Sequence, residues 1–193
     1  ALPISLLLCS IISLAIFLEK LWALQKKRVI PQKFIVEIEH LLRAEKFTEA
    51  IDLCKKTPAP ISRILLNGIR NYGKRREVIK EIIEEVGKRE AAHLDRYVES
   101  LATIASISTL LGLLGTIAGM IDIFGVISLQ DTVKPALLAG GISEALYTTS
   151  AGLSIAIPTL VFYRFVSARS DRLILEMEEY CLRMVELIKE QQR

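Results

Sequence analysis

The chain has 193 residues, of which 51% are hydrophobic, 6% are aromatic and 24% are charged, and its formal net charge is +3. A mean hydropathy of +0.39 is too high for an ordinary soluble domain, so the apolar and charged residues must be separated along the chain. The two histidines and three cysteines form no metal-ligand spacing and no disulfide framework, and the sequence holds no phosphate-binding, dinucleotide-binding or nucleophile motif. We therefore expect no enzymatic activity, no metal, no cofactor and no nucleic acid partner.

Three segments are almost free of charge and are long enough to cross a lipid bilayer. Ala1–Leu18 and Leu101–Ile121 carry no charged side chain, and Pro135–Tyr163 carries only Glu144. A spanning helix needs about 20 apolar residues, with a range of about 17 to 25. We therefore predict an all-α integral membrane protein in which two of the spans extend into a cytoplasmic helical bundle. The three predicted transmembrane helices are 1–25, 101–127 and 135–163.

The first segment is expected to be a span rather than a cleaved signal peptide, because it lacks a basic amino-terminal region and a small-residue cleavage site. Its helix should continue past the membrane, with Trp22 at the interface and Lys26, Lys27 and Arg28 just beyond it. The sequence begins at Ala1 without a methionine, so we expect a few residues before it.

The region 26–100 predicts short amphipathic helices in the cytoplasm. After Pro31 four apolar residues fall on one helical face. In the next stretch a plain helical hairpin closed by Pro58 and Pro60 is favoured over half of a tetratricopeptide unit, because no second copy of such a unit is visible. A further helix should run from Ile61 to about Tyr72. The apolar face after Pro31 consists of Phe34, Ile38, Leu41 and Leu42.

No proline interrupts the chain between Arg75 and about Ile127, where a charged stretch passes directly into the second span. At about 1.5 Å per residue, one helix over this stretch would be roughly 80 Å long, well beyond the ~30 Å hydrocarbon core. The third span should likewise continue as a carboxy-terminal helix over 164–193, with apolar residues spaced for packing against another helix. These residues are Leu173, Met177, Tyr180, Met184 and Leu187.

Positive charge is concentrated in two regions of the chain. Of the 25 lysines and arginines, 18 lie between Lys20 and Arg96, six lie between Arg164 and Arg193, and Lys134 stands alone between the second and third spans. By the positive-inside rule both charged regions face the cytoplasm. The amino terminus and the turn 128–134 are then expected on the outer side, and the carboxy terminus in the cytoplasm.

Glu144 is the only acid or base in the third apolar run apart from tyrosine hydroxyls. A carboxylate inside hydrocarbon costs roughly 2.5 to 3.5 kcal/mol on insertion scales, so such a group usually faces protein or water and often marks an ion path. Glu144 is therefore the first candidate for a functional residue.

Two threonines accompany this carboxylate. Thr148 lies one turn beyond Glu144 on the same face, so its hydroxyl can donate to the carboxylate or hold a water molecule. Thr116 lies at comparable depth in the second span. The alternative for each threonine is a hydrogen bond to the carbonyl one turn earlier in its own helix. Their occurrence with a carboxylate favours a polar track, whereas Asp122, near the outer end of the second span, can simply reach the interface.

Both later spans carry small residues every three or four positions, which lets helix backbones approach closely in lipid. Packing within one subunit accounts for one such face, so two faces on three helices favour oligomerisation around a shared axis. Pro158 lies inside the third span and is expected to kink it. The small residues are Ala105, Ser108, Gly112, Gly115 and Gly119 in the second span, and Gly141, Ala145, Thr149, Gly152 and Ala156 in the third.

Two of these segments carry a recognisable family pattern. LLGLLGTIAGMIDIF, at Leu110–Phe124, resembles the GLLGT signature of the MotA/TolQ/ExbB proton channel family. GGISEALYTTSAGLSIAIP, at Gly140–Pro158, resembles its third-helix signature, and EKLWALQKKRVIPQKF is similar to the end of the first helix in ExbB-type members. With three matched segments in order and three spans, the resemblance favours the ExbB/TolQ branch over flagellar MotA.

The resemblance implies a multi-pass protein of the bacterial inner membrane, with a periplasmic amino terminus. It implies a ring-forming homo-oligomer, a pentamer, around the helices of an ExbD- or TolR-like single-span partner that carries a membrane Asp. It further implies a TonB- or TolA-like energy transducer. The family's polar pore positions fall on Glu144, Thr116 and Thr149, whereas the helical-face argument selects Thr148. Asp122 and Tyr147 depart from the pattern.

The leading functional hypothesis is a proton-channel or motor subunit that uses the proton motive force to energise outer-membrane transport or envelope processes. A stator-type subunit of a gliding or motility motor is one alternative. A purely structural membrane scaffold for the partner helices is another, in which Glu144 only makes hydrogen bonds between helices.

Overall fold

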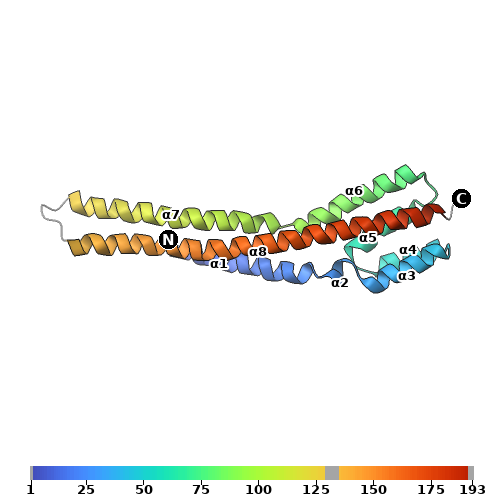
Figure 1. The fold of residues 1–193 in the computed structure, drawn as a ribbon, viewed down its shortest axis with the longest axis horizontal. Coiled ribbons are helices and arrows are strands. Elements are labelled where there is room, and N and C mark those ends of the chain that lie inside the picture. Colours follow the sequence, from blue (N-terminus) through green and yellow to red (C-terminus); the bar gives the residue numbers. More distant parts are fainter. Residues whose placement is uncertain (1, 129–134, 191–193) are drawn as a thin grey trace. The chain divides into compact units, whose positions relative to one another are not determined.

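The computed structural model describes residues 2–128 and 135–190, and every element among them is a helix (Figure 1). No strand occurs in these two ranges, which confirms the all-α prediction. The predicted outer turn 128–134 begins at Ser128, which is the last residue of α7, and the rest of it lies outside the described residues. The elements are α1 (Leu2–Ala23), α2 (Lys26–Val29), α3 (Gln32–Arg43), α4 (Phe47–Lys56), α5 (Pro60–Arg70), α6 (Arg76–Asp95), α7 (Val98–Ser128) and α8 (Pro135–Glu190).

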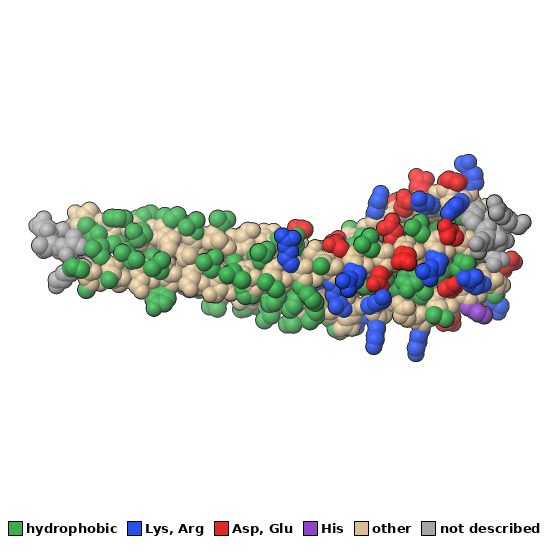
Figure 2. Space-filling view, viewed as in Figure 1, with side chains coloured by type: hydrophobic (Ala, Val, Ile, Leu, Met, Phe, Trp, Pro, Cys, Tyr) green, Lys and Arg blue, Asp and Glu red, His purple; other side chains and the backbone are tan. Residues whose placement is uncertain are grey.

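The chain divides into two compact units. The apolar unit consists of residues 1–19 and 97–165, and the charged unit consists of residues 20–96 and 166–193. Three of the described helices are long and apolar enough to cross a membrane, as the charge pattern predicted. Figure 2 shows hydrophobic side chains over the helices of the apolar unit and charged side chains over those of the charged unit.

The apolar unit contains α7, the first part of α8 and most of α1. Phe17 of α1 stacks on Phe162 of α8, with 4.0 Å between the ring centroids. Large aliphatic side chains cover the outside of α7, and this outward apolar surface suits a helix surrounded by lipid rather than water. The exposed side chains on α7 include Leu110, Leu113, Leu114, Ile117, Ile121 and Phe124.

The small residues of α7 and α8 face one another within the chain. A β-carbon placed on Gly152 would lie 2.8 Å from Gly112 Cα, and one placed on Gly119 would lie 2.8 Å from Ala145 Cβ. The two backbones therefore pack in direct contact along a seam, which we define by Gly112, Gly115 and Gly119 of α7 with Gly141, Ala145, Thr148 and Gly152 of α8. The expectation that two small-residue faces favour oligomerisation was wrong in its premise, because each face is occupied by the other.

The charged unit contains α2 to α6 and the end of α8. Its short helices are amphipathic and surround one apolar core, because none of them could bury its apolar face alone. The predicted helical hairpin is confirmed, since α4 ends at Lys56 and α5 begins at Pro60, where proline suits the first helical position. The core includes Ile30, Ile38, Leu42, Ile61, Ile64, Leu65, Ile69, Ile79, Met184 and Ile188.

The carboxy-terminal helix follows the predicted apolar spacing with one change. Leu173, Met177, Met184 and Leu187 are buried, whereas Tyr180 is only half-buried. Cys181 takes the buried position beside it, since a free cysteine behaves as a small apolar residue. The helix α8 runs through Pro158 without interruption.

The prediction of one helix from Arg75 to about Ile127 was wrong. The chain turns at Arg96 and Tyr97, where Tyr97 has φ 67°, a left-handed conformation that is uncommon for a residue other than glycine. Contacts between distant residues hold the end of α6: Lys20 Nζ donates to the Leu94 carbonyl at 3.0 Å. Because no proline or glycine marks this position, local sequence gave no signal for the break.

Candidate functional site

A groove of about 520 Å³ lies in the apolar unit beside the seam. Its polar side chains are Asp122 from α7 and Glu144 and Thr148 from α8. The remaining described lining residues are small or apolar, and Pro3 comes from α1. These residues are Pro3, Gly115, Gly119, Ile123, Val126, Gly141 and Ala145.

The groove lies where glycines allow α7 and α8 to pack closely together. A β-carbon on Gly115 would clash with the Thr148 side chain, and one on Gly141 would lie 2.5 Å from Ile123 Cγ1. The contacts form successive levels along the antiparallel pair: Gly115 with Thr148, Gly119 with Ala145, and Ile123 with Gly141.

The two carboxylates lie at neighbouring levels of this series of contacts between α7 and α8. Glu144 precedes Ala145 and so belongs near the level of Gly119, while Asp122 precedes Ile123 and belongs near the level of Gly141. Neighbouring levels are one helical turn apart, about 5.4 Å along the axis. The sequence treated Asp122 as ambiguous, whereas the structure places it in the same groove as Glu144.

These two acids are the only charged side chains between Glu99 and Arg164 among the described residues. Both are exposed at the surface of the chain. Since an ionised carboxylate in contact with hydrocarbon is costly, the groove must meet protein or water rather than lipid tails.

The hydroxyls of Thr116, Thr148 and Thr149 all donate to backbone carbonyls. Thr148 donates to the Glu144 carbonyl at 3.2 Å, not to its carboxylate, and Thr116 donates to the Leu113 carbonyl at 2.7 Å. Thr149 donates across the seam to the Gly112 carbonyl at 2.8 Å. The alternative left open by the sequence, a bond to the helix's own backbone, therefore describes Thr148 and Thr116. The bond between helices at Thr149 was not foreseen.

The predicted site residues separate into two groups. Glu144, Thr148 and the glycines at 115, 119 and 141 line the groove. Thr116, Thr149, Gly112 and Gly152 lie outside its lining, although the last three belong to the helix contact. Pro158 is exposed and takes no part in the groove. Asp122 was the residue that the sequence did not assign, and its spacing of one turn from Gly119 was the available signal.

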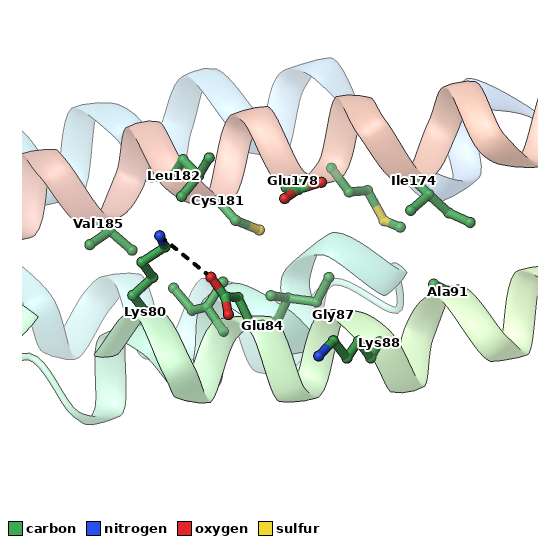
Figure 3. Close-up of a pocket in the computed structure, with 13 residues that line it drawn as sticks. Lys80, Glu84, Gly87, Lys88, Ala91, Ile174, Glu178, Cys181, Leu182 and Val185 are labelled. Atoms are coloured by element: carbon green, nitrogen blue, oxygen red, sulfur yellow. Dashed lines mark ion pairs between the residues drawn. The ribbon is translucent and has the colours of Figure 1, made fainter. Parts of the chain in front are cut away.

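A second hollow, of about 400 Å³, lies in the charged unit between α6 and α8 (Figure 3). Its walls are mainly apolar, and Lys80 and Glu84 form an ion pair at 3.6 Å on its rim. Burial raises the pKa of the Cys181 thiol to about 12, with a smaller contribution from the charge of Glu178. Cys181 therefore stays protonated and is a poor nucleophile. No cluster of three metal-ligating side chains occurs in the described ranges.

Comparison with known proteins relates this helical pattern to a family. Residues 56–179 match the MotA/TolQ/ExbB proton channel family. The chain is 33% identical over 173 residues to a biopolymer transport protein ExbB of Salmonella typhimurium, covering 83% of this chain and 69% of that protein. It is 30% identical over 172 residues to a putative biopolymer transport protein, ExbB-like 3, of Synechocystis sp., covering 86% and 82%.

A third relative is a Tol-Pal system protein TolQ of Pseudomonas aeruginosa, which is 31% identical over 150 residues, covering 67% of this chain and 65% of that protein. The match to the family covers well over half of the chain and includes both helices of the groove. The chain is therefore a membrane protein that belongs to the MotA/TolQ/ExbB proton channel family, in its ExbB/TolQ branch.

Proposed function

We propose that this chain is the proton-conducting subunit of an inner-membrane complex of the ExbB–ExbD or TolQ–TolR type. Such a complex would use the proton motive force to do work on the outer membrane. The observation that supports this most is the placement of Glu144 in an open groove of an otherwise apolar helical unit. A carboxylate there can accept and release a proton, which none of the apolar residues around it can do.

The proposed driving force acts through the charge of this group. Moving one elementary charge through the membrane potential is worth about 2.3 kcal/mol per 100 mV. Protonation of Glu144 removes the charge that must otherwise be solvated in the groove. A partner helix that carries its own carboxylate would then have a different preferred position before and after each proton transfer. The groove residues would thereby convert proton movement into movement of the partner.

We further propose a ring of copies of this chain, a pentamer, around the membrane helices of an ExbD- or TolR-like partner, with a TonB- or TolA-like protein as energy transducer. The open groove supports a partner, because two exposed acids need a polar covering within the membrane. The seam does not support the ring, since its small residues are used within one chain. The exposed apolar surface of α7 is one face available for contacts between copies.

The proposed orientation places the amino terminus in the periplasm and the carboxy terminus in the cytoplasm. Its support is the distribution of lysine and arginine, with 18 residues between Lys20 and Arg96 and six after Tyr163. The charged unit would then lie in the cytoplasm.

Within the proposed pathway the threonines have different tasks. Thr148 lines the groove and can offer an oxygen lone pair to a water molecule or to the partner, because its proton is already donated to the backbone. Thr149 would hold α7 and α8 in register through its bond to the Gly112 carbonyl. Thr116 would contribute its hydroxyl to the proposed pathway from α7, although it lies outside the groove lining.

The test is the substitution Glu144→Gln, which keeps the shape and hydrogen-bonding capacity of the side chain and removes its ionisation. In proteoliposomes that contain the chain with its co-purified single-span partner, we expect proton flux to fall at least about tenfold. Glu144→Ala should lose flux as well, while the complex keeps its size in gel filtration. Ser143→Ala, at the neighbouring exposed position outside the groove, serves as the matched control and should leave flux unchanged.

The same variant distinguishes the proton-channel function from the scaffold hypothesis. A scaffold in which residue 144 only makes hydrogen bonds predicts full activity of Glu144→Gln. Normal flux in that variant would exclude a proton-carrying role for Glu144.

A further inference from the structure

We propose that Asp122 is a second proton-carrying carboxylate of this site, and that it exchanges protons with Glu144 across the groove. This inference rests on the proposed function and extends it to a residue on the other helix. Neither the spacing of the acids in the sequence, 22 positions apart, nor the depth of Asp122 near the end of α7 pointed to such a pair.

The fold brings the two acids together from antiparallel helices. Both line the same groove, and the contacts of Gly119 with Ala145 and of Ile123 with Gly141 fix their levels one helical turn apart. The Gly119 contact involves the α- and β-carbons of Ala145, and the Gly141 contact involves the Ile123 side chain, so the helices cannot slide past each other at the Gly119 level without a clash. The pair is therefore positioned by the seam and not by the flexibility of the side chains.

Both carboxylates are available for exchange. No hydrogen bond or ion pair joins the carboxylate of Asp122 or of Glu144 to another side chain in the described part of the chain. The remaining described residues of the groove, from α1, α7 and α8, carry no ionisable group. Among the described residues of the groove, each acid therefore has the other as its only ionisable neighbour, about one helical turn away.

The proposed transfer is balanced in protons and charge. The O–H bond of the protonated carboxyl breaks, and an O–H bond forms on the other carboxylate, directly or through one bridging water molecule. The negative charge moves in the opposite direction, from one helix to the other. Thr148 borders the groove beside Glu144 and can accept a hydrogen bond from such a water molecule. One transfer thus moves a proton by about one helical turn along the membrane.

The first measurement compares the carboxyl bands by infrared difference spectroscopy, with the full chain in phosphatidylglycerol and phosphatidylethanolamine vesicles. We expect Asp122→Asn to change the frequency of the Glu144 carboxyl band, and Glu144→Gln to change that of the Asp122 band, because coupling between two groups is reciprocal. Carboxyl bands that keep the frequencies of the unmodified chain would overturn the inference.

The second measurement is proton flux in the same proteoliposomes with the partner. Asp122→Asn should reduce flux at least about tenfold, while Asp122→Glu, which keeps an acid, should retain most of it. Glu99→Gln, on the same helix but outside the groove, is the matched control. Asp122→Ser serves as a second variant if Asp122→Asn fails to fold.

The outcomes distinguish failure of the proposed function from failure of the proposed role of Asp122. If Glu144→Gln conducts normally, the proposed function itself fails. If Glu144→Gln is inactive but Asp122→Asn conducts normally, the proposed function stands and the role of Asp122 is refuted, even where the infrared bands are coupled. Loss of flux in both variants, with coupled bands and retained flux in Asp122→Glu, supports the pair.

Discussion

Glu90 is a buried carboxylate of the charged unit, 7% exposed, and it is paired with one side chain. Arg63 Nε donates to Glu90 Oε1 at 2.7 Å, and Arg63 Nη2 donates to the other carboxylate oxygen at 2.5 Å. This hydrogen bonding raises the pKa of the Arg63 guanidinium, so the arginine stays charged at all practical pH values. A fork-shaped contact of this kind joins α5 to α6 with a defined geometry.

Removing the arginine should cost more than removing both partners. We expect Arg63→Ala to lower the free energy of unfolding of the charged unit by about 1.5 to 3 kcal/mol, because Glu90 is then buried without its partner. Arg63→Met with Glu90→Met should recover much of that loss. Chemical denaturation of the two variants tests the pair, and equal losses would show that the ion pair contributes no specific coupling.

Two buried cysteines of the same unit should make its stability depend on pH. Burial raises the pKa of Cys54 and of Cys181 to about 12, from 9.0 for an exposed thiol. The folded unit therefore keeps both thiol protons between pH 9 and pH 12, while the unfolded chain releases them.

Stability should accordingly be complete below pH 9 and fall above it, by up to about 1.4 kcal/mol per pH unit for each thiol. Denaturation at pH 8 and pH 10 measures this decline. Cys54→Ala with Cys181→Ala, compared with the unmodified chain, should show a smaller decline, whereas an identical one would mean that other groups cause it.

At the scale of elements, the seam of α7 and α8 determines where the groove lies. Gly152 and Gly140 occupy the same helix but differ in their surroundings. A β-carbon on Gly152 would lie 2.6 Å from the Ser108 carbonyl oxygen and 2.8 Å from Gly112 Cα, whereas one on Gly140 meets no atom within 4 Å. Backbone atoms cannot yield as a flexible side chain does, so an alanine at 152 must push the helices apart.

Gly152→Ala should therefore destabilise the helix pair by about 1 to 3 kcal/mol. Gly140→Ala should leave it unchanged or slightly more stable, because alanine is the better helix former. Thermal unfolding of both variants in one detergent compares them directly. Equal stability would show that the close contact of α7 with α8 at Gly152 is absent in the detergent-solubilised chain.

At the scale of the whole molecule, the sequence predicted the features that depend on local composition and helical spacing. Three spans follow from charge-free segments, and the apolar positions of the charged unit follow from helical spacing. Contacts between distant residues could not be predicted in this way. The turn at Tyr97, the bond from Thr149 to Gly112 and the shared groove of Asp122 and Glu144 all depend on which helices become neighbours. The sequence located Glu144, but only the antiparallel pairing located its companion.

The ladder of contacts along the seam also limits how this protein can change through evolution. Gly119 faces Ala145, so an alanine at 119 fits only where residue 145 becomes glycine, the one smaller residue. The exchange Gly119→Ala with Ala145→Gly keeps the combined volume, whereas the first change alone does not. The same argument holds for Gly115 with Thr148, whereas Gly141 faces Cγ1 and Cδ1 of the flexible Ile123 side chain. Positions facing each other across α7 and α8 should therefore be inherited as pairs among relatives, and each pair records one level of the groove.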